Sequence, residues 1–312
     1  MATYLDLIDQ VDSFPILGHD ESLDIYRFQV VGVSVTLGFL LRPLADVLSE
    51  LPTDWEVSHR ARTVILIGGT NHAERSARVA ETLHYLRGRD EHFAAVLSKW
   101  RHETFPVYGP GRQVLLSFDR CASGLFGIVT YAVHALAYTM AEGDEDPMRI
   151  WVPRRSRLRP TYAGMLDSTA AGGIATGELP FETLLRECEE EAALPPGLVR
   201  QRARAVSLVS NFTVHGTGTD SLKLLQPEFH YVYDLPLPAH VMCTQNDSEV
   251  AEFHLWSVTQ VKQALANREF KPNSALVMLD FFIRHGILTP DNEPEYIDII
   301  SRLHRRLDFP TR

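Results

Sequence analysis

Three glutamates in the stretch Gly172–Leu194 have the residue type and spacing that could hold a divalent cation. Glu187, Glu190 and Glu191 stand at i, i+3 and i+4, so on an α-helix they form one acidic stripe. Carboxylates this close repel one another and raise one another's pKa unless a counter-charge is present. Mg²⁺ or Mn²⁺ takes oxygen ligands and supplies that charge. The sequence therefore predicts a magnesium or manganese site on this helix.

The residues around the acidic stripe predict the helix that carries it. Pro180 suits a first helical turn, and the spacing predicts a helix over Pro180–Ala193. A second stripe on this helix is apolar and consists of Phe181, Leu185, Cys188 and Ala192. The glycine-rich turn before the helix allows a close approach of backbone. The guanidinium of Arg186 could pair with Glu178 and brace this turn against the helix.

The segment resembles a Nudix box, the pattern Gly-x5-Glu-x7-Arg-Glu-U-x-Glu-Glu-x-Gly-U, in which U is a bulky apolar residue. The residues in register are Gly172, Glu178, Arg186, Glu187, Glu190, Glu191 and, at the last apolar place, Leu194. Two positions depart from the pattern. Cys188 stands at the first apolar place, which is a mild change because cysteine is a small hydrophobe. Ala193 replaces the last glycine and predicts that the helix ends without a left-handed glycine cap.

The resemblance also implies roles for these residues. It implies a divalent metal at Glu187, Glu190, Glu191 and Ala171, and a structural brace made of Arg186, Glu178 and Gly172. The three glutamates are expected to be catalytic, because the metal they hold neutralises developing charge and activates water for attack on a diphosphate phosphorus. Glu249, in a loop before an expected strand, is a further catalytic candidate, either as general base or as an extra metal ligand.

Motifs outside the box extend the resemblance from about Phe28 to Pro310. They resemble fungal and plant Nudix proteins whose N-terminal region is related to that of fungal thiamine pyrophosphokinase. The matching segments include Trp100–Glu103, Pro106–Gly109, Leu125–Tyr131, Ile150–Ser156, Thr161–Asp167, Phe270–Asn273 and Asp280–Ile287. The resemblance implies hydrolysis of an organic diphosphate, with damaged thiamine diphosphate cleaved to its monophosphate as the candidate. Ala163, Ser168 and Ser248 replace residues common in the family, which bears on the substrate more than on the reaction.

The chain as a whole predicts an α+β protein of two domains. Pro106–Arg112, with two glycines and two prolines, is the best boundary, so we expect a smaller α+β domain over residues 1–112 and a Nudix fold over 113–312. The Nudix fold is a mixed sheet between helices, here with a C-terminal helix at Tyr296–Leu307. An acidic turn is expected at Glu142–Asp146 and a loop at His215–Asp220.

Two pairs of residues are candidates for substrate binding. Arg154 and Arg155 precede the box in an otherwise acidic chain and match phosphate geometry, although a solvated loop explains them equally well. Trp100 and Tyr108 could stack on an aromatic part of the substrate, with core packing as the alternative.

The composition limits which kinds of molecule the chain can bind. The 312 residues include 30 basic and 40 acidic side chains, a net charge of −10, so the chain lacks the basic footprint of a nucleic-acid or anionic-membrane binder. Three widely spaced cysteines without a CxxC pair favour a reducing compartment, and no signal peptide or membrane-spanning run is visible. We expect a cytoplasmic protein that acts on a small-molecule diphosphate; its oligomeric state is left open.

Two alternatives to this hydrolase remain. One is a Nudix-fold isomerase, or a hydrolase of another diphosphate such as a prenyl diphosphate or ADP-ribose. The other is a non-catalytic Nudix-fold binding module, which would be marked by loss of the carboxylates. Because Glu187, Glu190 and Glu191 are intact, the sequence favours an enzyme.

Overall fold

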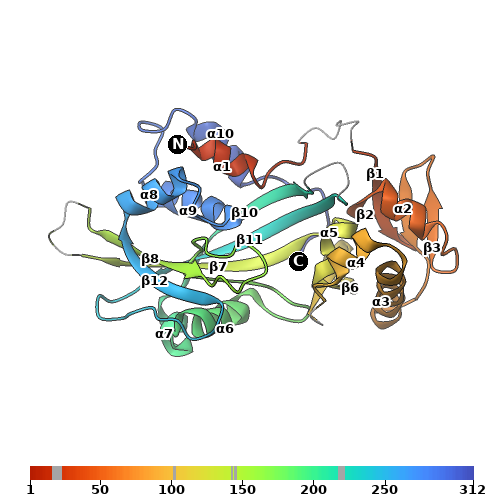
Figure 1. The fold of residues 1–312 in the computed structure, drawn as a ribbon, viewed down its shortest axis with the longest axis horizontal. Coiled ribbons are helices and arrows are strands. Elements are labelled where there is room, and N and C mark those ends of the chain that lie inside the picture. The colour runs from red at the N-terminus through yellow and green to blue at the C-terminus, as the bar shows by residue number, and fades with distance from the viewer. Residues whose placement is uncertain (16–22, 101–102, 142, 144–145, 217–221) are drawn as a thin grey trace.

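The computed structural model describes residues 1–15, 23–100, 103–141, 143, 146–216 and 222–312. Two sheets of unequal size lie toward opposite ends of the long axis, with a short hairpin and a small helix between them (Figure 1). The expected acidic turn at Glu142–Asp146 and the loop at His215–Asp220 fall partly outside the described residues, as do two residues of the motif Trp100–Glu103. None of the described helices has the length and apolarity needed to cross a membrane.

The smaller sheet follows the first helix of the chain. Its order is β2-β1-β4-β3, with β1 and β4 parallel and the other pairs antiparallel. The elements are α1 (Tyr4–Asp9), β1 (Ile25–Val30), β2 (Val33–Leu41), α2 (Arg42–Leu48), β3 (Trp55–Ser58), β4 (Thr63–Leu66), α3 (His72–Arg89) and α4 (Glu91–Leu97). Asn71 caps α3 by accepting a hydrogen bond from the Glu74 amide, which fixes the start of this helix.

The connection between the sheets packs on the smaller one. It consists of β5 (Thr104–Tyr108), the 3₁₀ turn η1 (Pro110–Arg112), β6 (Val114–Asp119), the turn η2 (Arg120–Ala122) and α5 (Ser123–Phe126). Phe118 and Phe126 are fully buried in one core with Phe28 and Trp55 of the small sheet. Residues 114–128, which the sequence places in the second domain, therefore contribute to the core of the first.

The larger sheet is mixed and has the order β10-β11-β7-β8-β12, with β9 paired to β7. β7 and β11 run parallel, and the other pairs are antiparallel. Its elements are β7 (Thr130–Met140), β8 (Met148–Arg155), β9 (Ala170–Gly173), α6 (Pro180–Ala192), α7 (Pro196–Arg202), β10 (Arg204–His215), β11 (Leu224–Pro236), β12 (Val250–Ser257), α8 (Val258–Ala266), α9 (Pro272–Arg284) and α10 (Tyr296–Leu303).

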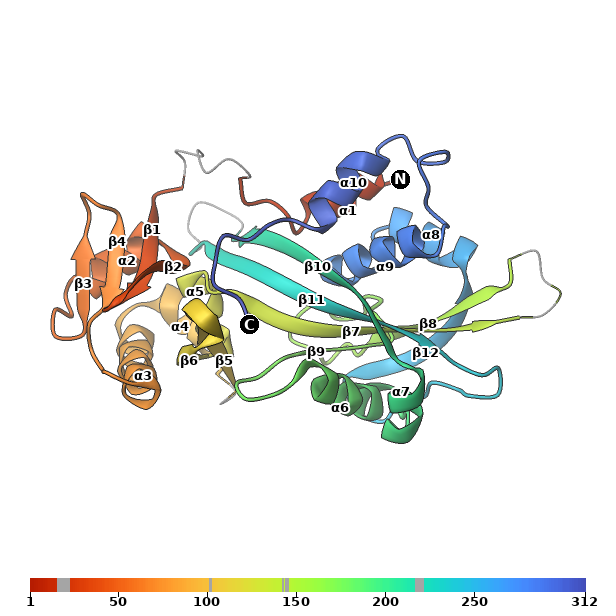
Figure 2. The same ribbon diagram turned by 180° about the vertical axis from the view of Figure 1, so that it is seen from behind.

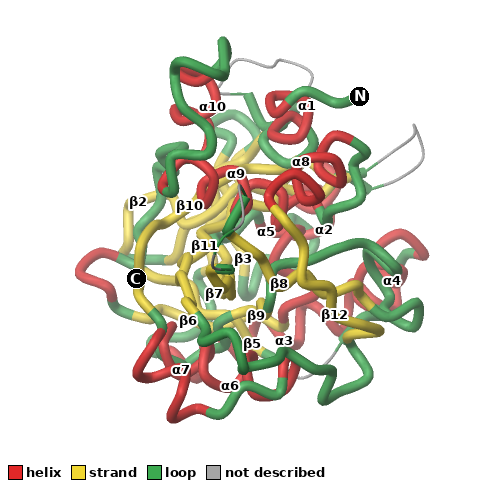
Figure 3. Tube along the Cα trace, turned by 90° about the vertical axis from the view of Figure 1, so that its left-hand side faces the viewer, coloured by secondary structure: helices red, strands yellow, loops and turns green. Residues whose placement is uncertain are grey.

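Helices cover both faces of this sheet because successive residues of its strands point to opposite sides. Ala135 and Ala137 of β7 share a core with α6, whereas Leu136 between them packs with α8 and α9. The end-on view shows α6 and α7 below the sheet and α8 and α9 above it (Figure 3).

The N-terminal helix lies on the far, C-terminal part of the molecule. In the view from behind, α1 lies beside α10 and away from the small sheet that follows it in sequence (Figure 2). The buried Asp12 carboxylate holds it there by accepting from Arg302 at 3.2 Å and from Arg305 at 2.7 Å. The amide of Ala2 also donates to the Ala266 carbonyl at 2.9 Å. This helix therefore contacts elements that lie almost at the other end of the chain.

The end of α6 differs from the sequence expectation. Loss of the glycine does not remove the left-handed cap, because Ala193 itself adopts φ 53° and ψ 29°. Its amide donates to the Glu189 carbonyl at 3.2 Å, and the Leu194 amide donates to Cys188 at 3.1 Å. These two bonds close the helix in the way a C-terminal glycine usually does. They hold an alanine in a conformation that costs an L-residue about 1 kcal/mol.

We predict that Ala193→Gly raises the free energy of unfolding by about 0.5–1 kcal/mol, because glycine adopts the left-handed conformation without the Cβ clash. Chemical denaturation measures the change. The neighbouring Ala192→Gly serves as control: it removes a buried methyl from the helix and should lower stability by about 1 kcal/mol. A loss of stability in both variants would contradict the strain assigned to Ala193.

Candidate active site

Strand β9 and helix α6 together hold the acidic stripe of the box. Gly172 of β9 lies so close to Glu187 that a Cβ at this position would collide with the Glu187 carboxylate, which explains the need for glycine. Glu191 accepts a hydrogen bond from the Ala171 amide at 2.8 Å. Cys188 and Ala192, on the apolar stripe, are fully buried in the core below the sheet. The packing of one face of α6 thus fixes the direction of its glutamates.

The acidic stripe opens on a cavity of about 380 Å³. Residues from the box line it together with the residue before β5, one residue of η2 and residues from two loops: Glu103, Arg120, Arg159, Ala171, Gly172, Gly173, Ala175, Glu178, Arg186, Glu187, Glu190, Asp247 and Glu249. The expected site residues Glu187, Glu190, Glu249, Ala171, Arg186, Glu178 and Gly172 are thus brought together, whereas Glu191 lies behind them, buried against β9.

Arg186 has more partners than the sequence indicated. Its Nη1 lies 2.8 Å from Glu187 and 2.9 Å from Glu190, and its Nη2 lies 3.6 Å from Glu178. The expected pairing with Glu178 is therefore the longest of three. Arg186 also gives the acidic stripe a basic partner, because it is adjacent to Glu187 and stands four residues before Glu190 on the helix.

Glu178 is held mainly by the loop and by α6. Its carboxylate accepts from the Thr183 hydroxyl at 3.0 Å and from the Ala175 amide at 3.3 Å. The C-terminal Arg312 donates to its backbone carbonyl at 2.7 Å. These bonds fix the turn that precedes α6, which is what a brace between turn and helix requires.

Burial of the carboxylates dominates the electrostatics of the site. Glu187 and Glu191 are only 9% and 7% exposed. Burial raises the pKa of Glu187 to about 7, opposed in part by Arg186 and reinforced by Glu190. Burial also raises the pKa of Glu191 well above its usual range, and the nearby Glu187 and Asp167 raise it further. Two neighbouring acids with raised pKa values, of which Glu187 lines the cavity, mark a place where positive charge is in short supply.

The donor set fits a hard divalent cation. Carboxylate oxygens are the ligands such ions prefer, and an ion beside buried Glu187 and Glu191 would supply the missing positive charge. Within the described residues, however, no three His, Cys, Asp or Glu side chains already stand in a metal-binding arrangement. The contacts explain this: Arg186 forms ion pairs with Glu187 and Glu190, and the Glu191 carboxylate accepts a hydrogen bond from the Ala171 amide.

Glu249 closes the cavity from the opposite side. It precedes β12, and its carboxylate forms an ion pair with Arg159. Its amide donates to the Asp247 carboxylate at 2.8 Å, and its carbonyl accepts from the Ser156 amide at 2.8 Å. The loop that carries Glu249 is therefore tied to the end of β8.

Four residues that line the cavity escaped the sequence analysis: Glu103, Arg120, Arg159 and Asp247. Arg120 donates to Glu103 at 3.1 Å, so this pair forms a wall of the cavity from the N-terminal part. Arg159 belongs to the basic run that includes Arg154 and Arg155, and it is the member of that run that lines the cavity.

The expected substrate-binding residues do not line this cavity. Arg155 is buried and pairs with the buried Asp167, and Arg154 donates to the Gly164 carbonyl and lies 3.6 Å from Glu252. Both arginines thus hold neighbouring segments of the same chain in place. The alternation of side chains along a strand does not predict such partners. Tyr108 packs edge-on against Tyr131, and Trp100 lines a different cavity.

Comparisons with known proteins identify two family models. The NUDIX domain matches residues 130–276, and a domain of unknown function, DUF4743, matches residues 4–130. The matches meet at residue 130, where β7 begins, rather than at the expected boundary after residue 112.

Relatives with similar sequences come from yeast and plants. An uncharacterized protein of Saccharomyces cerevisiae, YJR142W, is 39% identical over 219 residues, which cover 68% of this chain and 63% of the relative. Nudix hydrolase 24, chloroplastic, of Arabidopsis thaliana is 32% identical over 232 residues, which cover 74% of this chain and 59% of the relative. The chain thus spans about three fifths of the length of the curated relatives it matches.

Solved structures are more distant. The protein DR0079 from Deinococcus radiodurans aligns with a TM-score of 0.39 and 18% identity, covering 56% of this chain and 98% of that one. The NUDIX domain of Shewanella oneidensis NrtR, solved with ADP ribose, aligns with a TM-score of 0.34 and 19% identity, covering 47% and 82%.

The raised pKa of Glu187 predicts a pH dependence of stability in the metal-free protein. The folded state holds the Glu187 proton up to about pH 7, and the unfolded state releases it near pH 4.5. Stability is therefore highest below pH 4.5 for this group and falls as the pH rises through 7, by on the order of 1–3 kcal/mol.

Urea denaturation in EDTA at several pH values between 4.5 and 8 measures this loss. Glu187→Gln should flatten the profile, because the amide does not ionise, and the exposed Glu189→Gln should leave it unchanged. Equal slopes in the wild type and in Glu187→Gln would contradict the burial of an ionisable group at this position.

Proposed function

We propose, from the NUDIX domain that residues 130–276 carry, that this chain is a metal-dependent pyrophosphohydrolase of an organic diphosphate. The observation that carries the proposal is the cavity in which Glu187 and Glu190 face Arg120 and Arg159. One side can hold a cation, and the other can pair with phosphate oxygens. Both functions are needed to cleave a phosphoanhydride bond.

The proposal gives each group a role. Glu187, Glu190 and Glu191 hold Mg²⁺ or Mn²⁺, with Ala171 at the edge of the same site. When bound, the ion supplies charge neutralisation and a more acidic water. Arg120 and Arg159 exchange their carboxylate partners for phosphate oxygens, which a guanidinium can bind in a bidentate manner. That exchange frees Glu249 to accept a proton from water or to serve as a further ligand.

Arg186 remains a positioning residue in this scheme. Its guanidinium touches Glu178, Glu187 and Glu190, so it keeps the carboxylates of the box in one place when the cation is absent. Binding of the cation would replace the contacts of Arg186 with Glu187 and Glu190. Gly172 contributes by leaving room for the Glu187 carboxylate against β9.

An isomerase or a non-catalytic binding module remains the alternative class. A binding module would have no need for a buried acidic stripe whose carboxylates carry raised pKa values. Hydrolysis of a diphosphate to two products, measured with and without Mg²⁺, separates a hydrolase from both alternatives.

As substrate we propose a damaged thiamine diphosphate, hydrolysed to the monophosphate. Support comes from the resemblance to proteins related to thiamine pyrophosphokinase and from the presence of an N-terminal part beside the cavity, where Glu103 and Arg120 contribute to its wall. The cytoplasmic location, inferred from cysteine usage, is likewise a proposal. The plant relative named above is called chloroplastic.

We predict that Glu190→Gln lowers the rate of diphosphate hydrolysis by about a hundredfold or more, since it removes a charged ligand from the cation. Turnover of a substrate panel at saturating Mg²⁺ measures the effect. Glu189→Gln is the matched control, because Glu189 is the adjacent acid on α6 but does not line the cavity. Near-wild-type turnover of Glu190→Gln would sink the metal-ligand assignment.

We further predict that oxidised thiamine diphosphate is hydrolysed with a higher kcat/KM than ADP-ribose or a prenyl diphosphate offered at equal concentration. The physical reason is that selectivity comes from contacts to the organic part, because all three substrates offer the same diphosphate to the box. If ADP-ribose or the prenyl diphosphate has the highest value, the thiamine assignment is wrong while the hydrolase assignment stands.

A further inference from the structure

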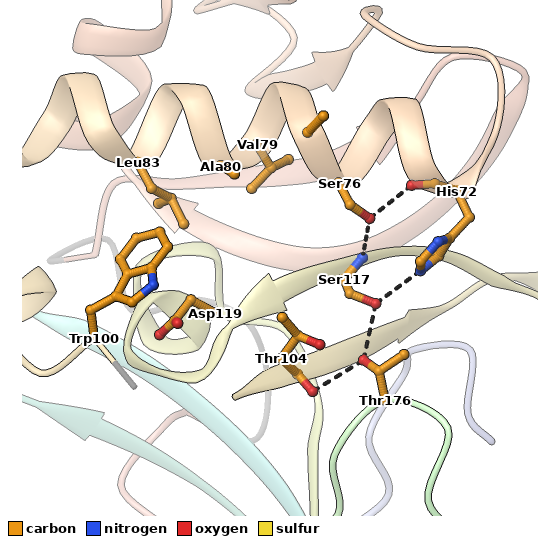
Figure 4. A pocket seen from close by; sticks show the side chains of 11 residues that line it. His72, Ser76, Val79, Ala80, Leu83, Trp100, Thr104, Ser117, Asp119 and Thr176 are labelled. Carbon is orange, nitrogen blue, oxygen red and sulfur yellow. Dashed lines mark hydrogen bonds between the residues drawn. The ribbon is translucent and has the colours of Figure 1, made fainter. Parts of the chain in front are cut away.

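A second cavity, of about 420 Å³, lies between α3 and the β5–β6 hairpin. Figure 4 shows Val79, Ala80 and Leu83 projecting from α3 toward Trp100 and Asp119 on the opposite wall. The cavity belongs to the part of the chain that matches the domain of unknown function, except for Thr176 at one edge. The reaction proposed above makes no use of it.

The Asp119 carboxylate is the unusual feature of this cavity. Asp119 is only 5% exposed, and its Oδ1 accepts a hydrogen bond from the Cys121 amide at 3.1 Å. The other oxygen, Oδ2, is buried and meets no donor among the described residues. A buried carboxylate oxygen without a donor is unfavourable, so a ligand that donates a hydrogen bond to it removes that cost.

The other polar groups of the cavity satisfy one another. His72 and Thr176 each lie within hydrogen-bond distance of the Ser117 hydroxyl, at 2.9 and 3.0 Å (Figure 4). Ser76 donates to the His72 carbonyl at 2.7 Å and accepts from the Ser117 amide at 2.9 Å. Among the described residues that line the cavity, Asp119 is therefore the one with a buried polar atom left over.

The remaining wall is apolar and partly flat. Ala80 and Leu83 form one side, and the Trp100 indole lies on the His84 imidazole with ring centroids 5.1 Å apart and an interplanar angle of 22°. A flat, largely apolar body fits such a wall. The charge of the cavity then selects what that body carries, because its wall contains an acid and, among the described residues that line it, neither arginine nor lysine.

We propose that this cavity is a binding site for a small planar molecule that carries an amino or amidinium group, whose N–H donates to Asp119 Oδ2. The apolar body lies between α3 and Trp100. The proposal adds a second site to the chain and does not depend on the hydrolase reaction.

This second site is separate from the diphosphate cavity but shares a wall with it. Neighbouring residues line the two cavities in three places: Glu103 with Thr104, Asp119 with Arg120, and Ala175 with Thr176. Side chains of adjacent strand residues point to opposite faces, so the end of the β5–β6 hairpin separates the two sites. An arginine faces the anionic diphosphate on one side, and an aspartate faces the cationic ligand on the other.

The test measures binding of benzamidine, a planar amidinium, to the full chain by isothermal titration, with the neutral benzamide as a probe of similar shape. We expect benzamidine to bind with a Kd of about 1 mM or lower. It should bind about tenfold more tightly than benzamide, because only benzamidine offers a charge-assisted hydrogen bond to Asp119.

Two variants test whether benzamidine binds in the second cavity. Asp119→Asn keeps an oxygen for the Cys121 amide and removes the charge, so it should abolish the preference for benzamidine. Ala80→Leu keeps the charge and fills the cavity, so it should weaken both probes; it also tests the site if the asparagine variant fails to fold. Glu190→Gln, in the other cavity, should leave benzamidine binding unchanged.

The outcomes that overturn the proposal are equally definite. It is wrong if benzamidine does not bind, if it binds the wild type, Asp119→Asn and Ala80→Leu alike, or if only Glu190→Gln weakens it. None of these measurements requires turnover or metal. A failure here is therefore distinct from a failure of the proposed hydrolase function.

Discussion

The structure depends above all on the cost of keeping two carboxylates out of water. Glu187 and Glu191 are buried between α6 and β9, where a charge is stable only if other groups approach it closely. This requirement accounts for the glycine at position 172, for the amide of Ala171 directed at Glu191, and for the three contacts of Arg186. The apolar face of α6, anchored by Cys188, holds the arrangement against the sheet.

The N-terminal part of the chain completes the site through the end of one hairpin. The β5–β6 hairpin packs into the core of the small sheet, and Glu103, just before β5, and Arg120, just after β6, line the cavity beside α6. Asp119, next to Arg120, lines the other cavity. Two consecutive residues therefore present opposite charges to two neighbouring cavities.

The sequence predicts most of what is local and little of what is tertiary. The bounds of α6 follow from Pro180 and helical spacing, because such patterns are set within a few residues. The sequence does not predict the left-handed Ala193, because alanine rarely adopts this conformation and two backbone hydrogen bonds at the end of α6 override its preference. Arg155 looked available for phosphate, but it pairs with Asp167, whereas Arg159 from the same run reaches the cavity. Which arginine of a basic run faces the site depends on the packing of a loop.

The position of α1 has a consequence for the order in which the chain acquires its structure. During synthesis α1 leaves the ribosome before both sheets, yet Asp12 finds its partners Arg302 and Arg305 only after those later residues have been made. Contacts so distant in sequence form late and slow folding, because a long loop must close before they add stability. The segment that carries α1 therefore packs into place only after the small sheet that follows it in the sequence has folded.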